Sequence, residues 1–138
     1  MLALIDTNVL LDVLLKREPF YQDSGAAIKL CNSKNSGCFS VVQCRDIYYL
    51  LSKYGLSTDD AKTTITLMVN KLSILNANSS DVNNALSSKM SDFEDALIAY
   101  CAARHGVTHI ITRNEKDFSL SPIKAISPQD FIATNASN

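Results

Sequence analysis

The sequence lacks several features that would define its class at once. It has no apolar run near the roughly 20 residues of a membrane span, and its first residues, MLALID, lack the basic start of a signal peptide. We therefore expect a cytoplasmic protein with no membrane partner. Internal repeats and linker-like composition shifts are also missing. The 138 residues thus predict one domain over residues 1–133, followed by a short disordered tail, 134–138.

Paired cysteine motifs are missing as well. The cysteines are Cys31, Cys38, Cys44 and Cys101. None has C-x-x-C spacing, so we expect buried, reduced thiols rather than a disulfide framework. His105 and His109 have zinc-like spacing, but they flank the end of a predicted helix and have no cysteine pair beside them, which argues against a zinc site.

A strong charge of either sign is absent too. The net charge is −1, from 13 basic and 14 acidic residues, whereas nucleic-acid-binding domains are usually basic. If four acids belong to a metal site, the remainder of the chain has three more basic than acidic residues. The composition therefore permits a nucleic-acid substrate but does not demonstrate one.

Short apolar strands alternate with helices along the chain. Strands are predicted at residues 2–5, 38–41, 73–77, 108–112 and 123–126, with helical patterns between them and a last helix beginning at Pro128. This order predicts an α/β domain with three layers, in which a mostly parallel sheet of about four to five strands is flanked by helices. In such a domain, strand ends and helix starts meet at one edge, where ligands bind.

The clearest single element is a helix over residues 91–105. Ser91 is a good N-cap, Glu94 completes a capping box with it, and Gly106 suits the position after the helix end. Residues 96–103 carry no charge, which is typical of a buried helix. Asp95 therefore lies at the start of a buried segment and requires a partner.

Four acids are predicted at the carboxyl edge of the sheet. Asp6 ends the first strand, Asp46 and Asp95 lie near helix starts, and Asp117 follows the fourth strand. Clustered carboxylates raise one another's pKa unless a cation neutralises them, and hard oxygen ligands suit Mg²⁺ or Mn²⁺. The neighbouring polar residues that could orient ligands or water are Asn8, Asp92, Thr112 and Asn114. We interpret the acids as a metal site, of the kind that activates water and clamps a phosphodiester in nucleases.

Three segments resemble the signatures of a known family. They are LIDTNVLLD at residues 4–12, SDFEDAL at 91–97 and ITRNEKDF at 111–118, and ISPQDF at 126–131 extends the likeness to the end of the domain. Together they resemble PIN-domain ribonucleases, in particular the branch containing toxins of VapC-type toxin–antitoxin pairs. The resemblance implies Mg²⁺- or Mn²⁺-dependent endonucleolytic cleavage of RNA by a metal-activated water, often by a homodimer, and a cognate antitoxin as partner.

The resemblance also implies roles for single residues. Asp6 and Asp95 would be the principal metal ligands, and Asp117 would complete the acidic ring with Asn114 beside it. Asp46 stands where the family usually has Glu, which shortens the reach of this side chain by one methylene. Arg113 is the nearest candidate to hold the RNA backbone.

Two other functional classes remain open from the sequence. One is a non-catalytic PIN-like module that binds RNA or protein through a site weakened by Asp46. The other is a phosphate-handling α/β protein. An aspartate-dependent phosphatase needs a second Asp two residues after the first, where this chain has Asn8, and a phosphoacceptor domain needs an acid pair at the first strand end.

Overall fold

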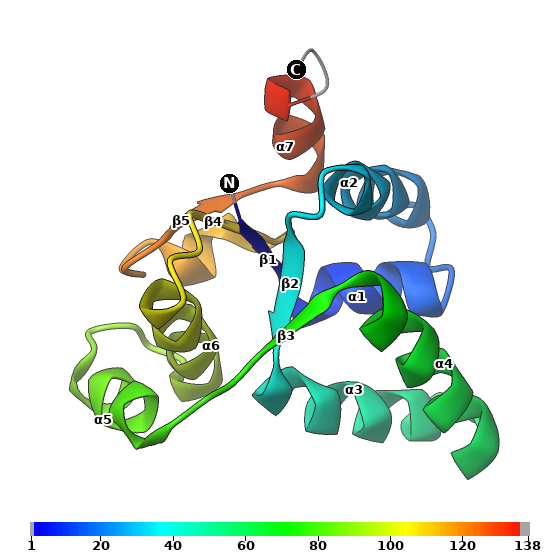
Figure 1. The fold of residues 1–138 in the computed structure, drawn as a ribbon, viewed down its shortest axis with the longest axis horizontal. Helices are drawn as coiled ribbons and strands as arrows, with labels where there is room; N and C mark the ends of the chain where they lie inside the picture. The colour runs from blue at the N-terminus through cyan, green and yellow to red at the C-terminus, as the bar shows by residue number, and fades with distance from the viewer. Residues whose placement is uncertain (1, 136–138) are drawn as a thin grey trace.

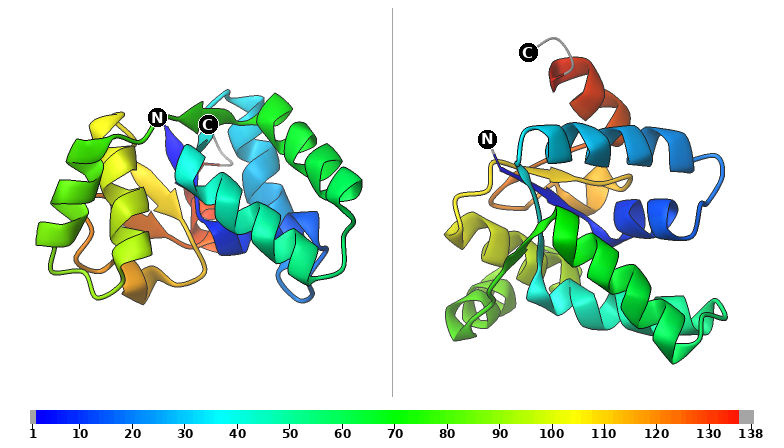
Figure 2. Two further views of the ribbon diagram at one scale, coloured as in Figure 1. Left: turned by 90° about the horizontal axis from the view of Figure 1, so that it is seen from below. Right: turned by 45° about the vertical axis from the view of Figure 1, so that its right-hand side comes forward.

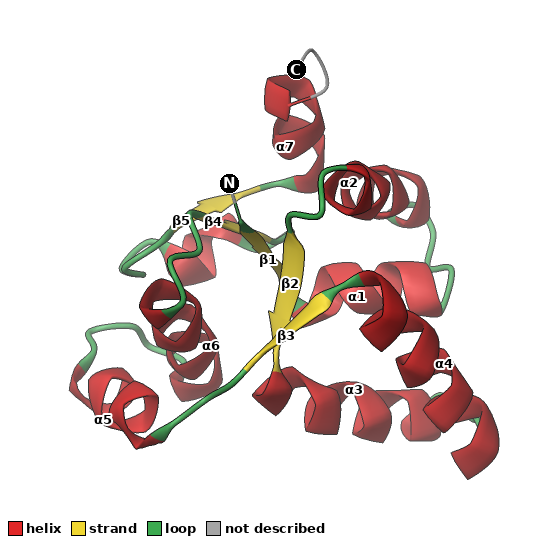
Figure 3. Cartoon of the chain, in the orientation of Figure 1, coloured by secondary structure: helices red, strands yellow, loops and turns green. Residues whose placement is uncertain are grey.

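The computed structural model describes residues 2–135. Strands and helices alternate as the sequence pattern predicts (Figures 1 and 3). The elements in chain order are β1 (Ala3–Ile5), α1 (Thr7–Leu14), α2 (Tyr21–Ser33), β2 (Gly37–Ser40), α3 (Val41–Lys53), α4 (Thr58–Lys71), β3 (Ser73–Leu75), α5 (Ser79–Ser87), α6 (Phe93–Arg104), β4 (His109–Ile111), the 3-10 helix η1 (Glu115–Phe118), β5 (Lys124–Ile126) and α7 (Pro128–Asn135).

The strands form one parallel sheet in the order β3-β2-β1-β4-β5. This confirms the predicted α/β class and the largely parallel sheet. The chain adds strands on one side of β1 and then returns to add β4 and β5 on the other side. The strand order therefore reverses at β1, and the crevice at such a reversal is the usual ligand site of open α/β sheets.

Two apolar layers cover the two faces of the sheet (Figures 1 and 2). Alternate residues of β1 divide between them, since Ala3 and Ile5 pack with α1, α2, α3, α4 and α7, whereas Leu4 packs with α5 and α6. A strand buried on both faces must be apolar throughout. This explains why the short strand β1 ends abruptly at the first charged residue, Asp6.

Polar side chains cap the helices that follow β1 and β3. Asp6 is the N-cap of α1 and accepts a hydrogen bond from the Thr7 amide. Asn78 caps α5 and accepts bonds from the Ser80 and Asp81 amides. Each side chain thus satisfies amides that the first turn of the helix leaves free.

The predicted tail begins too early. Thr134 and Asn135 belong to α7, and Asn135 is buried with its carbonyl accepting a hydrogen bond from Lys34 Nζ at 3.1 Å. Residues 136–138 lie outside the described part of the chain. All four cysteines are free thiols, as expected, although Cys44 is only half-buried. Across residues 2–135, no helix combines the length and apolar character needed to cross a bilayer.

Candidate functional site

An acidic pocket of about 330 Å³ lies at the carboxyl edge of the sheet. Its lining residues come from the end of β1 and from the helices α1, α3 and α6. They are Asp6, Thr7, Asp46, Tyr49, Leu50, Glu94, Asp95 and Ile98. Figure 2 (left) looks onto this edge, where α3 and α6 lie on either side of the start of α1. The fold therefore brings three of the four predicted acids, Asp6, Asp46 and Asp95, into one pocket.

Asp6 forms the inner end of the pocket. It is 6% exposed, and its two carboxylate oxygens accept hydrogen bonds of 2.8 Å from the Thr7 amide and the Thr112 hydroxyl. Burial raises the pKa of Asp6 above its ordinary value, and the charge of Asp117 acts in the same direction, while the two hydrogen bonds oppose this rise. The carboxylate is thus fixed in direction, and it lies where its negative charge is poorly solvated.

The start of α6 differs from the prediction. Asp92 is the N-cap, and its side chain accepts a hydrogen bond of 2.9 Å from the Asp95 amide. The capping box expected between Ser91 and Glu94 is therefore wrong, because Asp92 already satisfies the free amide. Glu94 lines the pocket instead. Sequence reasoning assigned Glu94 to the cap and so missed a fourth pocket acid.

Asp95 also has a strongly perturbed carboxyl. Its pKa is raised from 3.8 to about 7, first by burial and then by the charges of Asp6, Asp92, Asp117 and Glu94. Such a shift means that the folded protein disfavours the negative charge at this position. A cation bound among these oxygens would remove that penalty.

Gln43 joins the two strand ends that carry the acids, and sequence reasoning missed it. This buried side chain donates a hydrogen bond of 2.9 Å to the Ile5 carbonyl and accepts one of 2.7 Å from the Ser40 amide. Ser40 caps α3, and Gln43 completes the capping box. The spacing Ser-x-x-Gln was the available signal. Because Asp46 lies one turn further along α3, Gln43 fixes its position relative to Asp6.

Asp117 approaches the pocket from the fourth strand. Thr112 accepts a bond of 3.0 Å from the Asn114 amide while donating to Asp6, and the Asn114 carbonyl accepts one of 3.0 Å from the Asp117 amide. This chain of bonds ties η1 to Asp6. Asp117 is exposed and is not among the pocket-lining residues, but its charge raises the pKa of both Asp6 and Asp95.

Arg113 does not line the pocket. Its guanidinium donates to both oxygens of the fully buried Asp12, at 2.7 and 3.2 Å, and lies 3.7 Å above the ring of Phe20. Asp12 also binds Arg17, at 3.0 Å, and the Ser24 hydroxyl, at 2.9 Å. The predicted RNA-binding arginine therefore joins the loop after β4 to α1 and α2.

Asn8 lies two residues after Asp6, on the first turn of α1. Its backbone carbonyl accepts a hydrogen bond of 3.0 Å from Arg17, but its buried side-chain oxygen has no hydrogen-bond partner. An unsatisfied buried oxygen costs about 1–3 kcal/mol. The side-chain oxygen of Asn8, two residues after Asp6, is therefore a hydrogen-bond acceptor without a partner.

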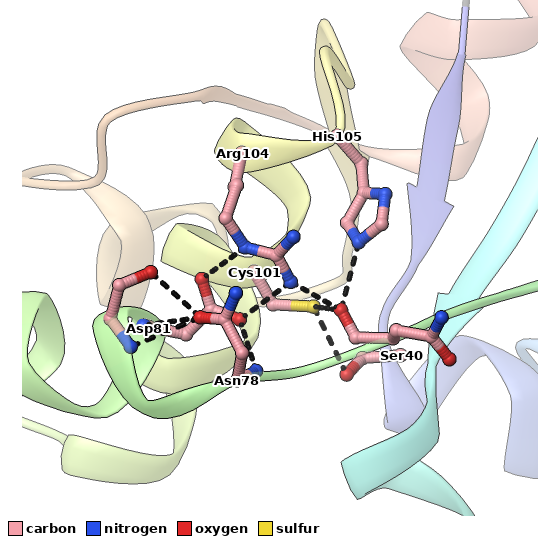
Figure 4. Close-up of polar contacts among 8 residues, drawn as sticks. Ser40, Asn78, Asp81, Cys101, Arg104 and His105 are labelled. Carbon is pink, nitrogen blue, oxygen red and sulfur yellow. Dashed lines mark hydrogen bonds and ion pairs between the residues drawn. The ribbon is translucent and has the colours of Figure 1, made fainter.

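The far end of α6 is held in place by a polar network (Figure 4). Arg104 binds the buried Asp81 of α5 through two nitrogens, at 2.9 and 3.0 Å, and also donates to the Asn76 carbonyl. His105 Nε2 and Cys101 Sγ lie 2.8 and 3.4 Å from the same carbonyl. Gly106 follows with φ of 76°, which confirms it as the residue that ends the helix. These contacts fix α6 at the end opposite Asp95.

The acids of the pocket suit a hard divalent ion, because such ions prefer oxygen ligands and these carboxylates line one pocket. They do not form a complete metal coordination shell. Among residues 2–135, no three Asp, Glu, His or Cys side chains converge as metal ligands do. The raised pKa of Asp95 comes first from burial and then from the neighbouring acidic charges.

Comparison with known proteins gives one family match. The model of the family described as PIN domain matches residues 3–116. No curated protein matches the chain.

Several solved structures share the fold at low sequence identity. VapBC2 from Rickettsia felis, bound to a promoter DNA fragment, superposes with a TM-score of 0.72 at 17% identity, over 92% of this chain and 98% of that one. DNA-bound VapBC from Salmonella typhimurium has a TM-score of 0.71 at 19% identity, over 93% of this chain and 99% of that one. A toxin–antitoxin complex from Klebsiella pneumoniae has a TM-score of 0.68 at 22% identity, over 91% of this chain and 97% of that one.

Proposed function

Because the chain belongs to the PIN-domain family, we propose that it is a Mg²⁺- or Mn²⁺-dependent endoribonuclease that hydrolyses RNA phosphodiester bonds. The observation that carries the proposal is the pocket shared by Asp6, Asp46 and Asp95. The raised pKa of Asp95 there, about 7, supports the proposal, because strongly perturbed carboxyls in a pocket are candidates for functional groups.

We assign each acid of the pocket a role from its position. Asp6 would be a rigid ligand, since the Thr7 amide and the Thr112 hydroxyl hold both of its oxygens. Asp95 and Asp46 would approach from helices on the two sides, with Asp117 at the outer edge. Glu94, which also lines the pocket, would accept a proton there. The ion, when bound, supplies a Lewis acid that polarises phosphate oxygens and lowers the pKa of water.

The decisive experiment is cleavage of a mixed RNA pool by the purified chain, with Mn²⁺, with Mg²⁺ and with chelator. We expect cleavage with either ion, and its loss in the Asp6→Asn and Asp95→Asn variants, which keep the side-chain volume. The exposed Glu18, outside the pocket, provides the control variant Glu18→Gln, which should cleave like wild type. Undiminished cleavage by both pocket variants would overturn the assignment.

A second candidate is a non-catalytic PIN-like module. Two observations favour it: Asp46 replaces the longer Glu of the family pattern, and the acids do not form a ready metal shell. Calorimetric titration with Mg²⁺ separates the two functions, since a metal-dependent enzyme must show binding heat that Asp95→Asn removes. Asp46→Glu should keep or increase cleavage if the shorter acid limits an active site.

We further propose that the protein is the toxin of a toxin–antitoxin pair and acts as a homodimer. The proposal is supported by its fold neighbours, which were solved as VapBC or toxin–antitoxin complexes. Expression in a bacterial host should arrest growth, and Asp95→Asn should relieve the arrest. Co-expression with a cognate antitoxin should restore growth and yield a stable complex on purification. Growth arrest that persists in Asp95→Asn would contradict a nuclease toxin.

A further inference from the structure

Asp12 is a fully buried carboxylate that lies outside the acidic pocket. It belongs to α1, six residues after Asp6, which corresponds to roughly 9 Å along the helix axis. Its oxygens bind Arg113, Arg17 and the Ser24 hydroxyl. Buried ion pairs often add little net stability over well-packed apolar residues, because burying the charges costs free energy. A bidentate pair does, however, impose a defined geometry on the groups that it joins.

The loop after β4 is attached to α1 at two points. Thr112 donates from its hydroxyl to Asp6, at the start of the helix, at 2.8 Å. The next residue, Arg113, donates to both oxygens of Asp12, near the helix end, at 2.7 and 3.2 Å. The ring centre of Phe20 lies 3.7 Å from the guanidinium carbon and so restricts it further. A loop held at one point can pivot about it, whereas two points roughly 9 Å apart fix its direction.

The direction of this loop determines where the outer acid of the site stands. The Asn114 amide donates to the Thr112 hydroxyl oxygen, and the Asn114 carbonyl accepts from the Asp117 amide, both at 3.0 Å. The charge of Asp117 raises the pKa of Asp6 and of Asp95, so this acid lies within electrostatic reach of both. Asp117 is exposed, and burial of its side chain therefore does not hold it there. Its position depends on the loop backbone.

We propose that the ion pair of Asp12 with Arg113 is a positioning device for the metal site, which holds residues 112–117 so that Asp117 stands beside Asp6 and Asp95. Arg113 is then a positioning residue that makes no contact with RNA, in contrast to the role that the family resemblance implies. This inference rests on the proposed nuclease function and adds a buried pair outside the pocket to the residues on which it depends.

Amide hydrogen exchange of the metal-free protein tests the loop itself. In Arg113→Gln we expect faster exchange of the Asn114 and Asp117 amides than in wild type. Arg104→Gln is the matched control, because Arg104 also binds a buried aspartate, Asp81, through two nitrogens, at 2.9 and 3.0 Å, and does so at the end of α6 opposite the pocket. Equally fast exchange of the two amides in both variants would mean that the pair only stabilises the fold, and would overturn the proposal.

Mn²⁺ affinity, measured without RNA from the paramagnetic resonance of the free ion, tests the consequence for the site. Arg113→Gln should bind Mn²⁺ about 10- to 100-fold more weakly than wild type, and Arg104→Gln should bind it like wild type. Asp12→Asn should match Arg113→Gln, and the double variant should be no weaker, because both changes break one contact. If Asp12→Asn does not fold, Arg113→Gln carries the test, since it keeps the bond of Asp12 to Arg17. Unchanged affinity in Arg113→Gln overturns the proposal.

Cleavage kinetics separate positioning from RNA binding. Arg113→Gln should lower kcat and leave the KM for RNA unchanged, whereas a raised KM at unchanged kcat would mean that the guanidinium binds RNA and would overturn the proposal. Wild type that neither binds Mn²⁺ nor cleaves RNA refutes the proposed function and this inference with it. Wild type that does both, beside an Arg113→Gln variant of unchanged Mn²⁺ affinity, refutes this inference alone.

Discussion

Removing the charge of Asp95 should stabilise the metal-free protein above neutral pH and abolish the proposed binding of Mg²⁺. The pKa of this carboxyl is raised from 3.8 to about 7 in the folded state. Between these values the folded protein retains a proton that the unfolded chain releases. The free energy of unfolding therefore falls as pH rises through this window, and the penalty is complete above about pH 7. Asn imitates the neutral acid and does not titrate, so that Asp95→Asn escapes the penalty.

The size of the effect follows from three contributions. A shift of about three pKa units corresponds to roughly 4 kcal/mol at most. The side chain is only half-buried, and solvent screening reduces this to about 1–2 kcal/mol. Against it, Asn loses the favourable charge in the first turn of α6, which is worth about 0.3–1 kcal/mol. The net expectation is a gain of about 1 kcal/mol at about pH 8, and none at about pH 4.

Urea unfolding followed by circular dichroism, in chelator at both pH values, measures this difference. Glu18→Gln, which removes an exposed carboxylate outside the pocket, should change stability equally at the two pH values. Saturating Mg²⁺ should stabilise wild type but not Asp95→Asn, because an ion that binds only the folded state raises its stability. A stability difference between Asp95→Asn and wild type that does not depend on pH would refute the reasoning.

The other predictions concern buried polar contacts. Asp12→Asn should lower the free energy of unfolding by about 3–5 kcal/mol, because Arg17 and Arg113 lose the charge of their shared partner. Urea unfolding measures this loss. A loss below about 1 kcal/mol would contradict the prediction and mean that water solvates the two arginines in place of the carboxylate. Gln43→Ala should cost about 2–4 kcal/mol, because it leaves the Ser40 amide without its partner. It should also weaken Mg²⁺ binding in calorimetry, and unchanged binding would show that the capping box does not position α3.

The pocket illustrates how a functional site can work against stability. Asp6 and Asp95 both have raised pKa values, so each carries a charge that the fold disfavours. The cost is tolerated because both residues start helices, where amides and the helix dipole offset part of it. A cation bound among these carboxylates, as proposed, would remove part of this cost.

The sequence by itself determined the class of fold and the edge that carries the site. Short apolar strands alternating with helices allow few arrangements other than a parallel sheet, and in such a sheet all strand ends meet at one edge. Asp6 and Asp46 follow from that rule alone, because each comes soon after a strand end. Local signals also sufficed for Gly106, whose role depends on its own backbone geometry.

Only the tertiary structure decided which polar side chains face the pocket. The sequence predicted Ser91 as the cap of α6, whereas the structure has Asp92 as the cap and Glu94 in the pocket. Arg113 follows the acidic strand end in sequence, but the buried charge of Asp12, 101 residues away, draws its guanidinium out of the pocket. Such outcomes depend on long-range electrostatic and packing partners, which a local pattern does not contain.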